Sequence, residues 1–253
     1  MKDETKRLHA LGRMSATEST TGVDPPLEMY NLHLSLFHLS SFIFHLSKMS
    51  FYIGTSGFSY KEWKGHFYPA DLPASKMLEY YSTHFNAVEI NNTFYRMPRE
   101  EMLSGWRETV PDTFRFVLKA PKRITHQKKL NGCEDDVSHL YNVSQALGTS
   151  RGPFLVQIPP YLRGDLDLLR TFLDCLPDGF RFALETRHDT WNDPETVRML
   201  VDSGHTFCVA DVDDEEPAEL PSDASWGYLR LRRTDYDEAS LEAWADRIRQ
   251  MPW

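Results

Sequence analysis

The sequence contains little cysteine, with three residues in a chain of 253. Cys133, Cys175 and Cys208 form an odd set, and no two of them stand at the spacing of a metal-binding or redox motif. We therefore interpret them as reduced thiols, which are typical of a cytoplasmic protein.

The sequence also lacks an excess of positive charge. It has 28 Lys and Arg against 37 Asp and Glu, which gives a formal net charge of −9. Domains that bind nucleic acid without sequence preference are usually basic, so this balance argues against such a domain. A local basic patch remains compatible with it.

A convincing membrane-spanning run is absent as well. Residues 30–47 contain no Asp, Glu, Lys or Arg, and their length is near the minimum of roughly 17 residues for a spanning helix. Histidines and serines dilute this stretch, however, and it is neither placed nor terminated like a signal peptide. We expect no membrane insertion, with an interfacial helix and a true span as the less favoured alternatives.

The N-terminal segment differs in composition from the rest of the chain. Residues 1–28 are polar, contain Ser, Thr and Pro clusters and show no apolar period, which is typical of disorder. Met49 immediately precedes the first convincing strand. We therefore expect residues 1–48 to be a disordered or mis-called extension and residues 50–253 to form the folded domain.

From residue 50 onward, short β-branched and aromatic runs alternate with helical stretches. The expected strands are 51–54, 87–91, 114–119, 154–158, 181–186, 206–210 and 226–231. The expected helices are 74–85, 99–109, 134–147, 165–175, 194–203 and 238–250. This alternation predicts an α/β fold with a parallel sheet. Because no GxGxxG turn follows the first strand, we favour a TIM-type (β/α) barrel over an open doubly wound sheet. The expected barrel is incomplete, since the sequence supplies about seven β/α units and no eighth strand.

Alternation along the strands predicts which side chains face the barrel interior. One side of each strand is apolar and suits contact with the helices, whereas the other side carries polar residues near the carboxyl end of the strand. The predicted inward set is Glu89, Asn91, Lys119, Gln157, Glu185, Arg187, Arg230 and Arg232. The carboxyl ends of the strands carry the active site in TIM barrels. A ligand site is therefore favoured, and a structural ion-pair lattice stays open as the alternative.

Four residues are candidates for catalysis. Glu89 and Glu185 are carboxylates that basic neighbours would keep ionised, which suits a general base or a metal ligand. Lys119 could act as a base or as a Schiff-base nucleophile if it is desolvated. His126 could join a divalent metal site together with His188, but no HxxE or HExxH spacing supports one, so metal dependence is only weakly indicated.

Basic and aromatic residues surround the same end of the predicted barrel. Residues 119–129 contain five Lys or Arg and one His. Together with Arg187, Arg230 and Arg232 they predict an anion clamp for phosphate or carboxylate groups, although several of the loop lysines could be ordinary solvated charges. Tyr95 and Trp191 could stack a sugar or base, or could simply cap the core.

Several motifs, in order along residues 50–250, resemble the YecE-like family, a widespread family of unknown function with a TIM-barrel fold. The segments that carry the resemblance are 54–60, 67–69, 88–96, 119–126, 155–160, 185–191 and 228–232. The resemblance implies that conserved positions of the family fall at Glu89, Asn91, Tyr95, Lys119, His126, Gln157, Glu185 and Arg187. It implies no particular reaction, and analogy with barrels that cut nucleic acid or isomerise sugars carries little weight.

The resemblance also implies two departures from the family pattern. Family members begin near Met49 of this sequence, and they continue beyond Trp253 with a further strand and helix. We therefore expect a truncated barrel. The leading hypothesis is an enzyme, a hydrolase or an isomerase or lyase, that acts on a phosphorylated or otherwise anionic ligand derived from nucleic acid or sugar. The alternatives are a non-catalytic nucleic-acid-binding module and an inactive fragment; the sequence does not indicate the oligomeric state.

Overall fold

The computed structural model describes residues 51–213 and 219–253. The expectations about the N-terminal extension and about a membrane segment at residues 30–47 concern residues outside these ranges. Within the described ranges, no helix combines the length and the apolar character that crossing a bilayer requires.

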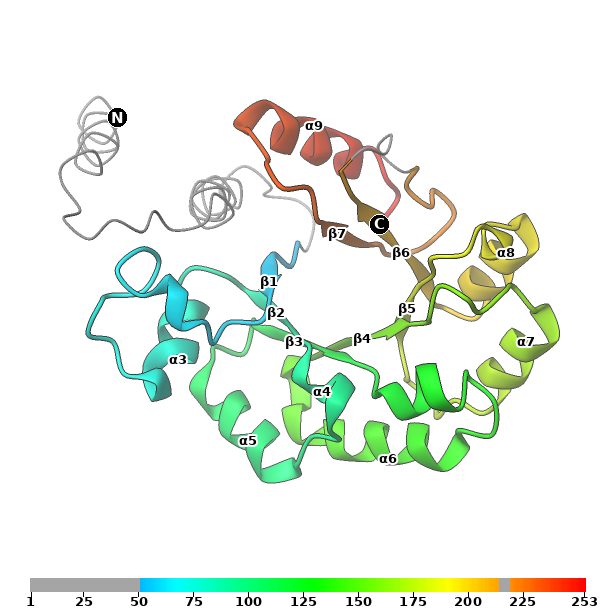
Figure 1. Cartoon of the computed structure of the whole chain (residues 1–253), viewed down its shortest axis with the longest axis horizontal. Helices are drawn as coiled ribbons and strands as arrows, with labels where there is room; N and C mark the ends of the chain where they lie inside the picture. Colours follow the sequence, from blue (N-terminus) through cyan, green and yellow to red (C-terminus); the bar gives the residue numbers. More distant parts are fainter. Residues whose placement is uncertain (1–50, 214–218) are drawn as a thin grey trace.

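Seven parallel strands form one sheet in the order β1-β2-β3-β4-β5-β6-β7. The strands are β1 (Gly54–Ser56), β2 (Ala87–Ile90), β3 (Arg115–Lys119), β4 (Arg151–Gln157), β5 (Phe182–Glu185), β6 (Thr206–Asp211) and β7 (Tyr228–Leu231). The sheet curls strongly, so that β1 and β7 approach each other (Figure 1). The predicted α/β architecture is confirmed, and its form is a curled sheet resembling a half-barrel.

The helices follow the outside of the curved sheet (Figure 1). They are α3 (Met77–Ser82), α4 (Asn92–Tyr95), α5 (Glu100–Thr109), α6 (Glu134–Ser144), α7 (Leu166–Asp174), α8 (Pro194–Asp202) and α9 (Glu238–Arg249). Short 3-10 turns are η3 (Lys61–Trp63), η4 (Ala74–Lys76), η6 (Gln145–Ser150) and η7 (Asp189–Trp191), and η5 (Arg123–Gln127) is a π-helical turn. Three of the long helices begin with an aspartate that caps their first turn, at Asp165, Asp193 and Asp237.

The first strand begins three residues later than the sequence predicts, at Gly54 rather than at residue 51. The side chain of Asn86 accepts a hydrogen bond from the Ile53 amide at 2.7 Å and donates one to the Phe51 carbonyl at 2.7 Å. These side-chain bonds satisfy the backbone of residues 51–53. The ladder with β2 therefore begins at Gly54, which pairs with Ala87.

The two faces of the sheet have different surroundings. The outer face supplies large side chains such as Phe116, Phe154 and Phe182 to the main core, where they pack against the helices. The inner face, at the amino-terminal half of the strands, carries a smaller apolar cluster formed by Val117, Leu155, Ala183 and Cys208, with Trp226 and Tyr228 against it. This apolar plug supports the polar side chains that follow it along the strands.

Side chains rather than backbone hydrogen bonds connect the two ends of the sheet within the described residues. Arg230 and Tyr228 on β7 reach Ser56 on β1 and Glu89 on β2. These contacts lie at the carboxyl ends of the strands and form part of the candidate site.

Candidate functional site

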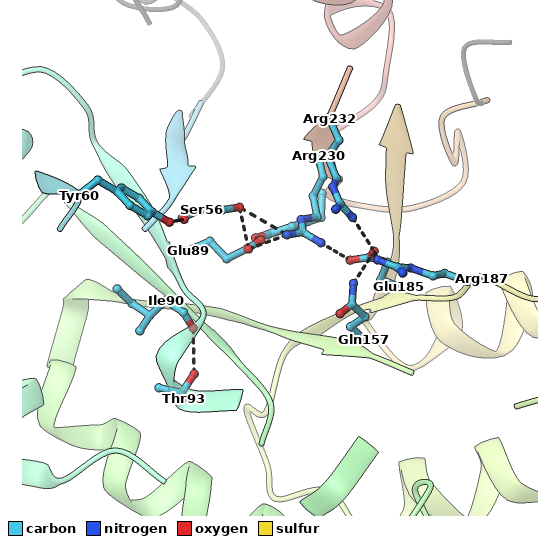
Figure 2. A network of polar contacts seen from close by, with 11 residues as sticks. Ser56, Tyr60, Glu89, Ile90, Thr93, Gln157, Glu185, Arg187, Arg230 and Arg232 are labelled. Carbon is cyan, nitrogen blue, oxygen red and sulfur yellow. Dashed lines mark hydrogen bonds and ion pairs between the residues drawn. The ribbon is translucent and has the colours of Figure 1, made fainter. Parts of the chain in front are cut away.

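An arginine lies between two buried carboxylates at the centre of the inner face. The Nη1 atom of Arg230 donates to Oε2 of Glu185 at 2.6 Å, and its Nη2 atom donates to Oε1 of Glu89 at 2.9 Å. Figure 2 shows the guanidinium of Arg230 bridging the two glutamates, which come from opposite parts of the sheet. Glu89 is 6% exposed and Glu185 is 2% exposed, so both charges require partners within the protein.

Neutral side chains complete the hydrogen bonding of the two glutamates. Ser56 Oγ donates to Glu89 Oε1 at 2.9 Å, and the Tyr228 hydroxyl donates to Glu89 Oε2 at 2.8 Å. Gln157 Nε2 donates to Glu185 Oε1 at 2.6 Å. Both carboxylates are therefore held in one orientation by groups from several strands (Figure 2).

Strand register explains why these residues meet. Gln157 and Glu185 are direct partners in the β4–β5 ladder, so their side chains leave the sheet on the same face. Because successive side chains alternate between faces, Arg230 lies on the same inner face as Tyr228. The inward positions that alternation predicts for Glu89, Gln157, Glu185 and Arg230 match these contacts.

The guanidinium of Arg230 remains charged in this environment. Burial disfavours its charged form, but Glu89 and Glu185 outweigh burial and raise its pKa above the ordinary value. Its Nε atom is buried and has no hydrogen-bond partner among the described residues. The Nε–H group of Arg230 is thus a donor that no described residue of the protein accepts.

Two further arginines approach Glu185 from the more open side of the network. Arg187 Nη2 and Arg232 Nη1 each lie 3.8 Å from Glu185 Oε1, and their side chains are 47% and 42% exposed. Both are drawn beside Glu185 in Figure 2. At 3.8 Å they add charge but no short hydrogen bond, so their donors are available to another acceptor.

Lys119 adds a fourth cation to the same region. It is half-buried at the end of β3, and its Nζ atom lies 4.7 Å from the centre of the Phe94 ring. No hydrogen bond or ion pair to this Nζ atom is present in the described part of the chain. Burial lowers the pKa of Lys119, and Arg230 and Arg187 lower it further while Glu185 and Glu89 oppose them.

His126 lies next to Lys119 on the η5 turn. Its ring packs edge-on against Phe94 with 5.0 Å between ring centres, and its Nδ1 atom is 2.9 Å from Thr125 Oγ1. Burial lowers the pKa of His126, and the nearby charges of Lys119 and Arg187 lower it further. Both effects favour the neutral form of the imidazole.

The charges of this region do not cancel. It contains four cations, Lys119, Arg187, Arg230 and Arg232, and two carboxylates, Glu89 and Glu185. Among these six side chains, two positive charges are in excess. This excess is located at the carboxyl ends of the strands in a protein whose overall charge is −9.

A model of the family described as "Protein of unknown function DUF72" matches residues 52–252. The chain belongs to this family. Over 112 residues it is 39% identical to UPF0759 protein YecE of Escherichia coli K12, a match that covers 44% of this chain and 41% of YecE. It is 24% identical over 172 residues to UPF0759 protein YunF of Bacillus subtilis, covering 58% of this chain and 57% of YunF. The matches thus span less than two thirds of these curated relatives, and the YecE-like resemblance is confirmed.

Solved structures of DUF72 family proteins have the same fold. A protein from Thermotoga maritima superimposes with a TM-score of 0.67 and 25% identity, covering 79% of this chain and 86% of that protein. One from Enterococcus faecalis gives a TM-score of 0.58 at 17% identity, covering 70% and 82%. These likenesses support the DUF72 architecture described above and name no ligand or reaction.

Most of the basic loop of the DUF72 domain is engaged within the protein. Arg123 Nε and Lys128 Nζ contact the two carboxylate oxygens of Asp136 at 2.7 and 2.8 Å. Lys129 lies 5.4 Å from the centre of the Tyr161 ring. These contacts fold the loop against α6. Lys119, which precedes the loop at the end of β3, is the basic residue of this segment that lies beside the central network.

The remaining candidates lie outside the central network. Trp191 is fully buried in the main core and donates its Nε1 hydrogen to the Leu162 carbonyl at 2.8 Å, so it has a packing role and offers no surface for stacking. His188 caps the η7 turn through Thr190. Asn91 is half-buried before α4, and Tyr95 is 73% exposed beside Phe94.

The structure also reveals contributors that the sequence did not single out. Ser56 and Tyr228 bind Glu89 directly. Tyr60 donates a hydrogen bond to the Ser56 carbonyl, and burial, with a further contribution from Glu89, raises its pKa. Tyr228 stands two residues before Arg230 on β7, so alternation along the strand accounts for its place on the inner face. Nothing in the local sequence of Ser56 indicates a contact with a glutamate 33 residues away.

Asp211 at the end of β6 does not join the other two carboxylates. It is buried on the opposite face, where it accepts hydrogen bonds from Arg233 Nε, the Tyr236 hydroxyl and Trp244 Nε1. Among the described residues no group of three His, Cys, Asp or Glu side chains is arranged to hold a metal ion. The geometry of the described residues therefore gives no support to the divalent metal that the sequence left open.

Proposed function

We propose that the carboxyl-terminal end of this sheet binds a small anionic ligand and acts on it as an enzyme. The ligand carries a phosphate or a carboxylate group. The observation that carries the proposal is the excess of two positive charges around two glutamates that are already paired. An anion placed there neutralises charge that the described residues leave uncompensated.

The four cations have different roles in this proposal. Arg230 is committed to Glu89 and Glu185, and it holds them in place. Arg187 and Arg232 are half-exposed, are not closely paired, and have planar forks of donors that suit phosphate and carboxylate oxygens. Arg187 and Arg232 form the anion clamp. The sequence had also assigned Arg230 to this clamp, but both of its Nη atoms are bonded to Glu89 and Glu185.

The geometry favours a small ligand over a nucleic-acid strand. A strand would need several exposed cations along its path. The basic loop does expose Lys122, Arg123 and Lys129, but Asp136 pairs with Arg123 and with Lys128. Arg187 and Arg232, by contrast, converge on one point beside Glu185 Oε1, which suits a small ligand. A purely structural ion-pair lattice is the other alternative. It would be expected to balance its charges, and this network does not.

The experiment is a calorimetric titration of the protein with inorganic phosphate and with sugar phosphates. We expect saturable binding that weakens about tenfold in Arg187→Ala and in Arg232→Ala, which corresponds to about 1.4 kcal/mol for each lost fork. The matched control is Arg198→Ala, because Arg198 is an exposed arginine on α8 whose contact with Glu195 also measures 3.8 Å. Equal affinity in all four proteins, or no binding by wild type, would contradict an anion site here.

Turnover is tested separately from binding. Glu185→Gln retains the shape of the side chain but removes one negative charge from the network. We expect it to bind phosphate at least as tightly as wild type and to lose product formation from any sugar phosphate that wild type converts. Binding without any turnover by wild type across the panel would favour a non-catalytic binding module.

A further inference from the structure

Lys119 differs from the other cations of the site. Arg230 is paired with two glutamates, and Arg187 and Arg232 lie near one of them. Lys119 Nζ, by contrast, has no carboxylate or carbonyl partner within the described residues, and its contact is the face of the Phe94 ring at 4.7 Å. This half-buried amine is therefore available to a ligand.

The backbone fixes the position of this amine. Lys119 pairs with Leu155 in the β3–β4 ladder, and its carbonyl accepts a hydrogen bond from Thr93 Oγ1 at 2.7 Å. Val117, two residues earlier, belongs to the apolar cluster of the inner face, so the side chain of Lys119 leaves the strand on that face, above the cluster. A rigid strand end, an aromatic wall and an apolar floor together orient and desolvate the amine.

We propose that Lys119 is a nucleophile that forms an imine with the carbonyl carbon of an anionic aldehyde or ketone. This inference rests on the proposed function, because Arg187 and Arg232 would hold the phosphate or carboxylate of the same molecule. It adds a substrate class, a carbonyl compound with an anionic group, and a covalent step.

The step balances without an oxidant or a reductant. The neutral amine attacks the carbonyl carbon, so that a C–N bond forms and the C–O π bond becomes a hydroxyl group. Loss of water then gives the imine, which takes up a proton to become an iminium. The protons that move during addition and dehydration are exchanged with solvent, which reaches the half-buried amine. His126 packs edge-on against Phe94, the ring that also contacts Lys119.

The electrostatic surroundings favour the reactive form of the amine. Burial and the charges of Arg230 and Arg187 lower the pKa of Lys119, which increases the fraction of neutral amine near pH 7. When an anionic substrate binds, its charge offsets those of the arginines. The iminium that forms is then stabilised by the substrate's anion and by Glu185 and Glu89.

Reductive trapping tests the proposal directly. Wild-type protein is treated with glyoxylate, and separately with glyceraldehyde 3-phosphate, in the presence of cyanoborohydride, which reduces an iminium to a stable secondary amine. We expect one adduct per chain, mapped by peptide mass spectrometry to Lys119 and suppressed by excess inorganic phosphate. Lys119→Arg should lose the adduct, whereas Lys122→Arg, at an exposed position of the same loop, should keep it.

The outcomes separate this inference from the proposed function. Phosphate binding by calorimetry without an adduct at Lys119 would overturn the imine and leave the anion site intact. Labelling spread evenly over surface lysines, or an unchanged adduct yield in Lys119→Arg, would overturn it as well. A second readout in wild type needs no variant: the labelling rate of Lys119 should reach half its maximum at a lower pH than that of Lys122, and coincident profiles would contradict the proposal.

Discussion

Two buried carboxylate clusters lie on opposite faces of the same sheet, and they are built differently. On the outer face, both oxygens of Asp211 are bonded, one to Arg233 and the other to Tyr236 and Trp244, which anchors the α9 region to β6. On the inner face, Glu89 and Glu185 share Arg230 but are surrounded by additional cations. In the first cluster the protein supplies a partner for each carboxylate oxygen. The second cluster has hydrogen-bond donors and positive charge that the described residues do not pair.

This difference separates a structural cluster from a candidate binding site. Burial alone does not distinguish them, because Asp211 and Glu185 are each 2% exposed. What distinguishes them is whether the protein supplies all the partners. A completed network contributes to stability, and a network with excess charge is expected to respond to a ligand.

The largest expected effects come from removing one carboxylate from each cluster. Asp211 and Glu185 are both buried and each accepts several hydrogen bonds, so Asp211→Asn and Glu185→Gln should each lower the free energy of unfolding by about 3 kcal/mol. Urea denaturation at pH 7 measures both. Asp167→Asn, at an exposed carboxylate paired with Arg170, is the control and should change stability by less than about 0.5 kcal/mol. If Asp211→Asn behaved like this control, Asp211 would not be a structural anchor.

A pH titration should reveal a third buried group that serves structure alone. His205 is buried against Phe182 with 4.1 Å between ring centres, and burial, assisted by Arg181, lowers its pKa to about 4. The unfolded chain binds a proton near pH 6.5, so stability is complete above that pH and falls as pH decreases toward 4, by about 3 kcal/mol.

The measurement for His205 is the free energy of unfolding from pH 7.5 to 4 in wild type and in His205→Phe. The free energy of unfolding of wild type minus that of His205→Phe should decrease as the pH falls across this window. Inorganic phosphate should leave this trend unchanged, because His205 lies outside the candidate site. Parallel pH profiles would show that His205 titrates normally.

A smaller effect is expected at the edge of the candidate site. Tyr228→Phe removes the hydrogen bond to Glu89 Oε2 and should lower stability by about 1–2 kcal/mol because it leaves a buried acceptor unpaired. Phosphate affinity should be unchanged, since Arg187 and Arg232 are untouched. A large loss of affinity would mean that Tyr228 itself contacts the ligand.

The sequence predicted much of the fold and the centre of the site for a physical reason. Parallel strands that pack on helices need one apolar face, so the polar residues opposite them, such as Glu89, Gln157 and Glu185, could be assigned to the inner face from alternation. The same rule places Asp211 on the outer face, because Cys208 is an inner residue and Asp211 lies three positions later.

Other features depend on contacts between distant segments and could not be predicted locally. The start of β1 is set by the side chain of Asn86, and two cations of the basic loop, Arg123 and Lys128, are paired with Asp136. Trp191 follows a strand like a binding residue, yet its indole lies in the core and bonds to Leu162. In each case the sequence gives the residue type, and the long-range partner decides its role.

The most direct test of the central claim is rescue of stability by phosphate. Glu185→Gln and Asp211→Asn are unfolded with urea in the presence and absence of 10-fold to 100-fold the wild-type dissociation constant of phosphate. We predict that phosphate stabilises wild type by about 2.7 kcal/mol at the higher concentration and stabilises Glu185→Gln by more than that, because in the variant the ligand replaces a missing negative charge. In Asp211→Asn phosphate should add no more than it adds to wild type. Equal stabilisation of all three proteins, or none, would contradict the distinction between a binding network and a structural one.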